Sequence, residues 1–346
     1  MASAEVPVCQ ATGPILVTGV AGFIGCFTAV QLLERGEVVI GIDEVNDYYD
    51  TTQKRANLSR LVELGGDRYK LYEGDICDET LLNRIYDDAS GSISRIVHLA
   101  ARAGVRPSIE DPFVYIHPNI EGTTRLMEVA RRRGNASFVM ASSSSVYGDS
   151  VNDAFTEEDS VDNPVSPYAA SKKACELLAY TYHHLYKMNI ACLRFFTVYG
   201  PSGRPDMAPF KFVDWIYRGK EIQQFGDGSS ERDYTYIEDI VDGVIRSMDR
   251  PAGYQVYNLG NGSPISLVKF IDLAQQAVGI PAKIKILPMQ PGDVQRTCAD
   301  ISKARTMLGY NPKTPFETGL QATAKWYCEE YAPSRGIERA LEESMQ

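Results

Sequence analysis

The sequence predicts an α/β fold, in which a doubly wound parallel sheet is followed by a smaller C-terminal α/β domain. Residues 14 to about 195 alternate short apolar runs with longer helical patterns, which is typical of a parallel sheet covered by helices on both faces. The first apolar run leads directly into a glycine-rich turn. From about residue 196 the expected elements become shorter, and Pro and Gly become more frequent. We therefore expect a smaller domain over the carboxyl ends of the strands, where ligands of such sheets bind.

The first strand and the turn that follows it predict a dinucleotide site. The apolar run Ile15–Thr18 is expected to be a buried strand. It is followed by Gly19-Val20-Ala21-Gly22-Phe23-Ile24-Gly25 and by a helical pattern to Arg35, with Gly36 as its stop. The three glycines would allow a tight turn, a close approach of the backbone to a pyrophosphate, and close packing of the helix on the sheet. The N-terminus of the helix would offer N–H groups and a positive dipole to the phosphates.

The second strand, residues 38–42, ends in an acidic residue. Asp43 lies 18 residues after Gly25, where a carboxylate binds the ribose hydroxyls of adenosine. Because this carboxylate would repel a 2′-phosphate, the sequence favours NAD over NADP.

Further strands are expected at residues 95–101, 137–143 and 190–196, and helices at 122–133 and 168–188. Ser166 can cap the last of these helices, and Pro167 suits its first position. Tyr168 and Lys172 are four residues apart and share a face of this helix. A phenol is a poor base at neutral pH, with a pKa of roughly 10, but a nearby ammonium favours the phenolate. The pair is therefore a candidate for proton transfer, and the alternative is an ordinary exposed tyrosine and lysine.

Composition and charge limit the class of partner. The 346 residues are 44% hydrophobic, which suffices for a packed core in two domains or one large domain. The net charge of −10 argues against nucleic acid or an anionic membrane as the main partner. No apolar stretch is long enough to span a membrane. Residues 1–13 lack the core of a signal peptide, and we expect a flexible tail there.

The cysteines and histidines do not predict a disulfide framework or a metal site. Seven cysteines occur without a Cys-x-x-Cys pair, so we expect reduced thiols and a cytoplasmic protein. His183 and His184 are adjacent on a helix, which is not the spacing of metal ligands, and we predict no metal. His98 lies in an apolar run and is expected in the core.

The Gly-x-x-Gly-x-x-Gly turn and Tyr168-x-x-x-Lys172 together resemble the extended short-chain dehydrogenase/reductase family. Further matches run along nearly the whole chain: Gly74-Asp75-Ile76, His98-Leu99-Ala100-Ala101, Asn119-Ile120-Glu121-Gly122-Thr123, Ser142 to Gly148, and Arg232-Asp233-Tyr234-Thr235-Tyr236. The resemblance implies a Rossmann-type NAD-binding domain over residues 14–195, to which the chain returns near 233–258. It also implies that residues 196–346 mainly bind a nucleotide sugar, and that the protein is a homodimer formed through the helices near Gly122 and Tyr168.

The resemblance also implies roles for individual residues. Tyr168 would take the proton of a secondary alcohol while hydride passes to the nicotinamide, and Lys172 would hold the nicotinamide ribose. Ser143 would hold or relay the proton, with Ser144 and Ser145 beside it. Besides Tyr168 and Lys172, the residues implied for cofactor binding are Gly19, Gly22, Phe23, Ile24, Gly25, Asp43, Asp75, Ile76, Leu99, Ala100, Ala101, Asn119 and Phe195.

Ser144 and Ser145 separate this chain from close relatives in the family. Nucleotide-sugar 4,6-dehydratases carry an Asp-Glu pair at these positions, and nucleotide-uronate decarboxylases carry Glu at the position of Ser145. A site with hydroxyls alone can take a hydride and return it, but it lacks the additional acid and base groups. This combination implies a 4-epimerase.

Two segments suggest the substrate. Residues 100–108 and 197–208 resemble segments of the UDP-glucuronate 4-epimerases, although Ser202 replaces the usual Trp. Thr197 and Arg204 are the candidates to bind a sugar carboxylate, since a guanidinium forms bidentate, charge-assisted hydrogen bonds with one. The resemblance adds Arg106 and Met207 to the substrate site, and Phe225, Arg232 and Asp293 for the uracil, diphosphate and ribose.

The resemblance therefore implies an NAD-dependent 4-epimerase that converts UDP-glucuronate to UDP-galacturonate. The nearest alternative is a UDP-glucose/UDP-galactose 4-epimerase, which performs the same chemistry on a neutral sugar. A nucleotide-sugar dehydratase or decarboxylase is disfavoured by the serines. A non-catalytic NAD-binding sensor is disfavoured by the intact Tyr168, Lys172 and Ser143.

Overall fold

The computed structural model describes residues 8, 12–90, 93–134, 137–288 and 294–340. The chain divides into two compact units. Unit 1 consists of Met1–Phe195, Ile240–Leu259 and Asp300–Asn311. Unit 2 consists of Phe196–Asp239, Gly260–Ala299 and Pro312–Gln346.

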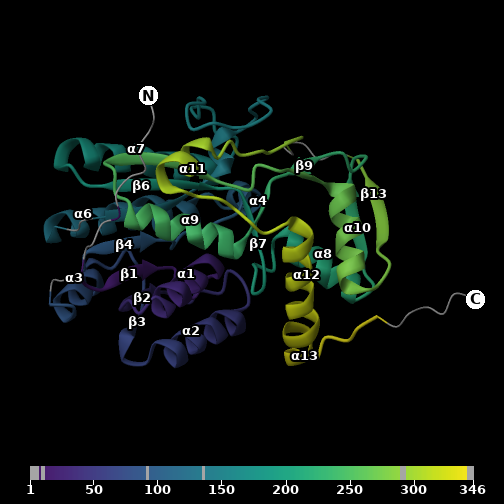
Figure 1. Cartoon of the computed structure of the whole chain (residues 1–346), viewed down its shortest axis with the longest axis horizontal. Helices are drawn as coiled ribbons and strands as arrows, with labels where there is room; N and C mark the ends of the chain where they lie inside the picture. The colour runs from purple at the N-terminus through teal and green to yellow at the C-terminus, as the bar shows by residue number, and fades with distance from the viewer. Residues whose placement is uncertain (1–7, 9–11, 91–92, 135–136, 289–293, 341–346) are drawn as a thin grey trace, which may run out of the picture. The chain divides into compact units, whose positions relative to one another are not determined.

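Unit 1 is built on a seven-stranded sheet with the order β11-β6-β5-β4-β1-β2-β3. Every neighbouring pair of strands is parallel, so the carboxyl ends of all seven strands lie at one edge. The strands form a single layer (Figure 1). Their bounds are β1 (Ile15–Thr18), β2 (Val39–Asp43), β3 (Tyr69–Glu73), β4 (Arg95–His98), β5 (Ser137–Ser143), β6 (Ile190–Phe195) and β11 (Tyr254–Leu259).

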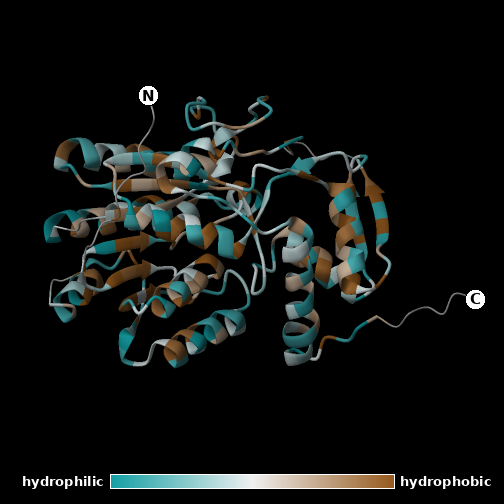
Figure 2. Ribbon diagram, viewed as in Figure 1, coloured by the Kyte–Doolittle hydropathy of each residue, from teal (hydrophilic) through white to brown (hydrophobic). Residues whose placement is uncertain are grey.

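Helices cover both faces of this sheet, as the alternating sequence pattern predicts. α1 packs beside α2, whereas α6 packs between α3 and α7. A core cluster joins β1, β2, β4 and β5 to α3, α6 and α7, with Leu16, Leu82, Leu126 and Met140 almost fully buried. The strands of the sheet are accordingly rich in hydrophobic residues (Figure 2). The helices of unit 1 are α1 (Phe23–Glu34), α2 (Thr51–Gly65), η1 (Gly66–Arg68), α3 (Glu79–Asp88), α4 (Val105–Glu110), α5 (Phe113–Tyr115), η2 (Ile116–Gly122), α6 (Thr123–Arg133), η3 (Ser144–Tyr147), α7 (Pro167–Tyr186), α11 (Ser302–Leu308) and most of α9 (Ile237–Asp249).

The predicted doubly wound parallel sheet is confirmed, and most of the differences are in the bounds of its elements. The strand predicted at 95–101 ends at His98. The N–H of Leu99 still reaches the carbonyl of Thr18 at 3.3 Å, but the N–H of Ala100 donates to the hydroxyl of Thr18, the last residue of β1. The helix predicted at 168–188 ends at Tyr186, where Lys187 has a left-handed backbone with φ of 57°. The helix predicted from Gly122 continues a π-helix, η2, which the sequence analysis missed.

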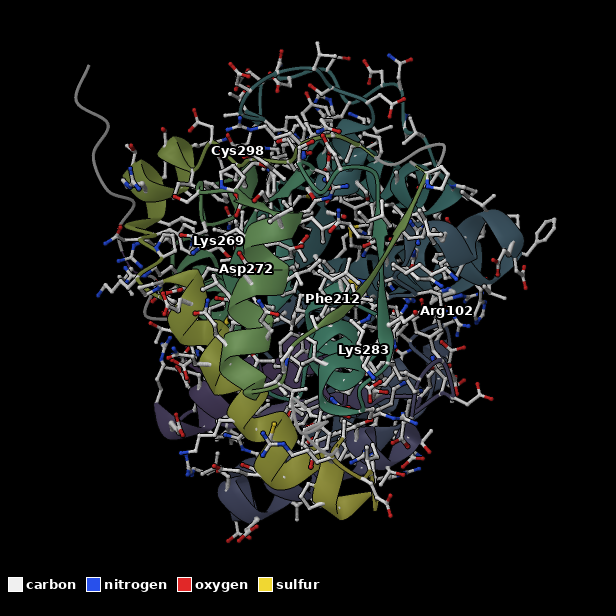
Figure 3. All side chains as sticks on the ribbon, turned by 90° about the vertical axis from the view of Figure 1, so that its right-hand side faces the viewer. Arg102, Phe212, Lys269, Asp272, Lys283 and Cys298 are labelled. Atoms are coloured by element: carbon white, nitrogen blue, oxygen red, sulfur yellow. The ribbon has the colours of Figure 1, made fainter. Side chains whose placement is uncertain are left out.

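Unit 2 combines helices with three two-stranded sheets. β7 pairs with β10 and β8 with β13 in parallel, while β9 and β12 are antiparallel. Its core is aromatic: the rings of Phe212, Tyr234 and Phe316 all contact that of Phe270 on α10, whose outer side carries Lys269 and Asp272 (Figure 3). The elements are β7 (Thr197–Tyr199), α8 (Ala208–Tyr217), β8 (Glu221–Phe225), β9 (Glu231–Arg232), β10 (Tyr234–Tyr236), β12 (Ile265–Ser266), α10 (Leu267–Val278), β13 (Lys283–Leu287), α12 (Phe316–Trp326), η4 (Tyr327–Tyr331) and α13 (Ala332–Ser334).

A search of the described helices for a membrane-spanning candidate finds none with the required length and hydropathy.

Candidate active site

The glycine-rich turn after β1 has no room for side chains at two positions. Gly19 has φ of +70°, and a Cβ atom there would lie 2.7 Å from the backbone nitrogen of Ala100. A Cβ atom on Gly25 would overlap the carbonyl oxygen of Gly19. The turn is therefore pressed between the end of β4 and the first turn of α1. Such a bare backbone fits the close approach of a dinucleotide pyrophosphate to the N-terminus of a helix.

Asp43, the last residue of β2, is tied to this turn. Its Oδ2 accepts a hydrogen bond from the N–H of Ala21 at 3.0 Å, and its Oδ1 accepts one from the N–H of Val45 at 2.8 Å. Burial raises the pKa of the carboxyl, and these two N–H groups oppose the increase. Each carboxylate oxygen has a second lone pair, so Asp43 can also accept hydroxyl donors from a ribose.

The start of α7 holds Tyr168 and Lys172 at the end of β5. The hydroxyl of Ser166 accepts the N–H of Ala169 at 3.1 Å, and Pro167 occupies the first helical position, which confirms the predicted cap. Tyr168 is half-buried, and its backbone N–H donates to the hydroxyl of Ser108 at 3.1 Å. Lys172 is 5% exposed, and its Nζ donates to the carbonyl of Ala141 at 2.9 Å. Lys172 thus extends from α7 to β5, while the ring of Tyr168, one helical turn earlier, contacts that of Tyr115 with centroids 6.0 Å apart.

The serines lie where β5 ends and η3 begins. The Oγ of Ser143 accepts hydrogen bonds from the N–H of Ser145 at 3.1 Å and from its hydroxyl at 2.9 Å. Ser144 follows as the first residue of η3 and is half-buried. Among the described residues, the hydrogen bonds of Ser143 and Ser145 involve hydroxyl and N–H groups and no carboxylate. The cluster can therefore hold or relay a proton but does not include a carboxylic acid or carboxylate base.

Asn119 joins the loop after β4 to the helix that carries Lys172. It lies in η2 and is 1% exposed. Its Oδ1 accepts the N–H of Arg102 at 2.8 Å, and its Nδ2 donates to the hydroxyl of Ser171 at 2.9 Å. Single π-helical turns are frequent at functional sites, and this one lets the amide reach both elements.

His98, at the end of β4, is a core residue as expected. Its two ring nitrogens lie 2.8 Å from the hydroxyl of Thr18 and 2.9 Å from that of Thr123. Burial, together with the nearby Lys172 ammonium, lowers the pKa of His98 to about 3. The ring is therefore neutral at ordinary pH and links β1, β4 and α6.

Asp75 and Ile76 follow β3, and Ile76 is buried. Burial would raise the pKa of Asp75, but the N–H of Cys77 and the ring of His117, 2.7 Å away, hold it below its ordinary value. The side chains of Asp75, Cys77 and His117 have donor atoms within 4.8 Å of one another and are close enough to share a metal ion. The hydrogen bond between Asp75 and His117 already accounts for much of this proximity, so the absence of a metal stays a prediction.

The residues predicted to bind substrate are mainly in unit 2. The N–H of Thr197, the first residue of β7, donates to the carbonyl of Asp233 at 3.1 Å. Arg204 is half-buried and forms a bidentate pair with Asp206, at 3.0 Å from Nε and 2.6 Å from Nη2. The other positions are the residue before α8 for Met207, the end of β8 for Phe225, β9 for Arg232, and an exposed position on α4 in unit 1 for Arg106; Asp293 lies outside the described residues.

The sequence analysis missed a buried polar network next to the serine segment at the end of β5. Glu176 of α7 and Arg194 of β6 form an ion pair, and Ser142 donates to Glu176. Two signals could have revealed it. Glu176 is four residues after Lys172 and so shares its helix face, and Arg194 is a single charge within an apolar strand.

A seven-stranded parallel sheet with a glycine turn after β1 and a Tyr-x-x-x-Lys helix beside β5 is the architecture of the short-chain dehydrogenases/reductases. Within this class, a family model described as GDP-mannose 4,6 dehydratase matches residues 16–323. The chain belongs to this family of NAD-dependent epimerases and dehydratases. The family resemblance inferred from the sequence motifs is thereby confirmed.

Several individual members of the family that are similar to this chain are 4-epimerases of UDP-sugars. The chain is 47% identical to a UDP-glucuronate 4-epimerase of Thermodesulfobacterium geofontis, over 91% of this chain and 96% of that one. It is 35% identical, with a TM-score of 0.84, to the crystal structure of a Bacillus cereus UDP-glucuronic acid 4-epimerase in complex with UDP-glucuronic acid and NAD, over 91% and 99% of the two chains. A UDP-glucose 4-epimerase of Thermotoga maritima has a TM-score of 0.83 at 30% identity, over 92% and 99%. Because these two TM-scores are nearly equal, the fold alone does not distinguish a uronate from a hexose substrate.

Proposed function

We propose that this chain interconverts UDP-glucuronate and UDP-galacturonate by epimerisation at C4. The observation that carries the proposal is the hydroxyl cluster of Ser143, Ser144 and Ser145 beside the helix of Tyr168 and Lys172. The family's dehydratases and decarboxylases have carboxylates in that cluster, whereas here the described hydrogen bonds of Ser143 and Ser145 involve none. The high identity to a UDP-glucuronate 4-epimerase supports the choice of a uronate substrate.

The residues around the glycine turn fit NAD as the cofactor. Gly19 and Gly25 leave the backbone bare, and Asp43 presents a carboxylate at the end of β2. Lys172 would hold the nicotinamide ribose. NAD held there would supply a reversible hydride acceptor, so no other oxidant or reductant would be consumed.

Tyr168 is proposed as the base that takes the proton of the 4-hydroxyl, with Ser143 holding that hydroxyl. The resulting 4-keto sugar rotates about its link to the diphosphate and presents its other face. Tyr168 would then return the proton to the oxygen at C4, which completes the inverted alcohol once C4 has been reduced on its other face. Because Ser144 and Ser145 carry hydroxyls, these two residues cannot supply the carboxylate that would remove water.

Thr197 and Arg204 are proposed to bind the sugar carboxylate. A 4-keto uronate is a β-keto acid, which loses carbon dioxide when the breaking bond aligns with the carbonyl π system. A guanidinium and a hydroxyl that hold the carboxylate would prevent this alignment while the sugar turns. The bidentate pair with Asp206 supports this role, because it fixes the plane of the Arg204 guanidinium.

The experiment is to incubate the purified protein with UDP-glucuronate, without added NAD, and to separate the products by chromatography. We expect UDP-galacturonate. A parallel incubation with UDP-glucose tests the alternative: UDP-galactose without any UDP-galacturonate would replace the proposed substrate with a neutral hexose. Formation of neither epimer would refute epimerisation itself.

The proposal also includes the oligomeric state and the cellular location of the protein. A homodimer is supported by an exposed apolar stripe on α7, where Leu177, Tyr180 and Leu185 are 56%, 53% and 58% exposed. A cytoplasmic location is supported by the six described cysteines, which are free thiols.

A further inference from the structure

A buried ion pair lies directly beneath the candidate active site. Glu176 is 2% exposed and Arg194 is 3% exposed. The ion pair is bidentate: Nε of Arg194 donates to Oε1 of Glu176 and Nη2 donates to Oε2, each at 2.9 Å. Burying two charges costs free energy that an apolar pair would not, so a pair in this position calls for a reason other than stability.

The pair is linked to the residues before the serine cluster. The hydroxyl of Ser142 donates to Oε1 of Glu176 at 2.6 Å, and Ser142 is opposite Arg194 in the register of β5 and β6. One helical turn earlier, Nζ of Lys172 donates to the carbonyl of Ala141. Two consecutive residues of β5, just before Ser143, are therefore bonded to the helix face that carries Lys172.

The same pair also holds the far end of the serine segment. Nη1 of Arg194 donates to the phenol oxygen of Tyr147 at 3.0 Å, and this phenol donates to Oδ1 of Asn258 at 2.6 Å. Burial raises the pKa of Tyr147 to about 12, so its proton stays in place for the second bond. Tyr147 is the last residue of η3. The segment from Ser142 to Tyr147 is thus hydrogen-bonded at both ends to one guanidinium–carboxylate pair.

We propose that Glu176 and Arg194 are positioning residues, which set the distance between the Ser143 hydroxyl and the Tyr168 phenol. The inference rests on the proposed function and adds two residues that touch neither cofactor nor substrate. Proton transfer requires heavy atoms within about 2.6–3.2 Å, and a misplacement of about 1 Å can cost about a hundredfold in rate. Hydrogen bonds with fixed directions prevent β5 from shifting against α7, whereas apolar packing alone would let the two elements slide past each other.

The decisive variant replaces both charges by apolar groups, Glu176→Leu/Arg194→Met. Such replacements of buried ion pairs are often neutral for stability, so we expect a folded protein that retains its bound NAD. The turnover number should fall about tenfold to a hundredfold, with the KM for the UDP-sugar changed less than about threefold. A double variant with the turnover number of the wild type overturns the proposal.

Ser142→Ala provides a second test that does not depend on how the double variant folds. It removes only the hydroxyl that joins β5 to Glu176. We expect the melting temperature to stay within about 3 °C of the wild type, because one hydrogen bond is lost, and the turnover number to fall about fivefold. An unchanged turnover number in Ser142→Ala would also contradict the proposal.

The matched control is the ion pair at the opposite edge of the same sheet. Arg95, 4% exposed at the amino end of β4, pairs with Glu37 at 2.9 Å and with Asp249 at 3.4 Å. Arg95→Met should lower the melting temperature and leave the turnover number unchanged. If it lowers the turnover number as much as Glu176→Leu/Arg194→Met does, the effect is a general loss of structure and the positioning role is wrong.

Failure of this inference can be separated from failure of the proposed function. All variants are measured on whichever UDP-sugar the wild type epimerises, UDP-glucuronate or UDP-glucose. A wild type that uses only UDP-glucose revises the substrate but still tests the positioning role. A wild type that epimerises neither sugar overturns both.

Discussion

At the scale of single residues, the candidate chemistry depends on a few side chains with fixed neighbours. Tyr168 is half-buried at the start of α7, while Lys172 is bonded to the backbone of β5. The phenol can therefore meet a substrate, whereas the ammonium is held in place. This division of roles suits a tyrosine that exchanges a proton with a substrate and a lysine that keeps its place on the same helix face.

Tyr168→Phe removes the phenol and keeps the ring. We expect the turnover number to fall by a factor of about 10² to 10⁴, as for other general bases, with a smaller change in KM. Steady-state epimerisation of UDP-glucuronate measures both. Tyr186→Phe, at the other end of the same helix, is the control and should behave as the wild type. Undiminished turnover in Tyr168→Phe would remove the tyrosine from the mechanism.

His98 gives a prediction for pH. Its pKa is lowered by burial and by Lys172 to about 3, while in the unfolded chain it is about 6.5. Below pH 6.5 the unfolded state binds a proton that the folded state does not, so stability falls as pH falls toward 3. The loss attributable to this ring is at most about 1.4 kcal/mol per pH unit. Denaturant unfolding of wild type and His98→Gln between pH 7 and 4.5 should show a shallower loss in the variant; parallel curves would refute the assignment.

Arg204→Ala tests the proposed recognition of the sugar carboxylate. Losing charge-assisted hydrogen bonds worth about 1.5–3 kcal/mol should raise the KM for UDP-glucuronate by about tenfold or more. The fraction of decarboxylated product should also rise, because the keto acid is no longer held. Arg218→Ala, which removes an arginine paired with Asp214 in the same unit, is the control. Unchanged KM and unchanged product ratio together would show that Arg204 has another role.

At the scale of elements, the beginning of α7 connects a local sequence signal to the site. Ser166 caps the helix through the N–H of Ala169, and the next two residues are Pro167 and Tyr168. Fraying of this first turn would displace the phenol before it affected the rest of the helix. The cap would therefore link the stability of α7 to the proposed proton transfer by Tyr168.

Ser166→Ala should destabilise the protein by about 1 kcal/mol, the usual effect of losing an N-cap, and should also lower the turnover number. The matched control is Asp78→Ala, which removes the cap of α3, where Asp78 accepts the N–H groups of Thr80 and Leu81. We expect a similar loss of stability there with unchanged turnover. If Ser166→Ala and Asp78→Ala have the same turnover number, the first turn of α7 does not position Tyr168.

The elements also show how far sequence alone leads. The glycine turn, Asp43 and the Tyr168–Lys172 pair could be predicted because each depends on short, fixed spacings. The sequence marks Glu176 and Arg194 as unusual positions, but it does not reveal that they pair with each other and with Ser142, because the partners are 34 and 18 residues apart. The π-helix η2 had one usable signal: Pro118, inside it, cannot donate the backbone hydrogen bond of a regular α-helix.

At the scale of the whole molecule, the outer face of α7 raises the question of what covers it. Leu177, Tyr180 and Leu185 are exposed on the helix whose first two turns carry Tyr168 and Lys172. Single exposed apolar residues are ordinary, but a run of them along one helix is typical of a contact surface. The family resemblance predicts that a second copy of the chain covers it, through this helix and the one near Gly122.

Leu177→Asp tests this prediction, because a carboxylate buried between two copies would lack a partner. Light scattering after size-exclusion chromatography should give twice the chain mass of 38.3 kDa for the wild type and a single chain mass for the variant. The control is Val151→Asp, at a position 96% exposed outside any helix or strand, which should remain dimeric. A monomeric wild type would refute the dimer. A dimeric Leu177→Asp would place the interface on another surface, since the charge at position 177 would then stay in water.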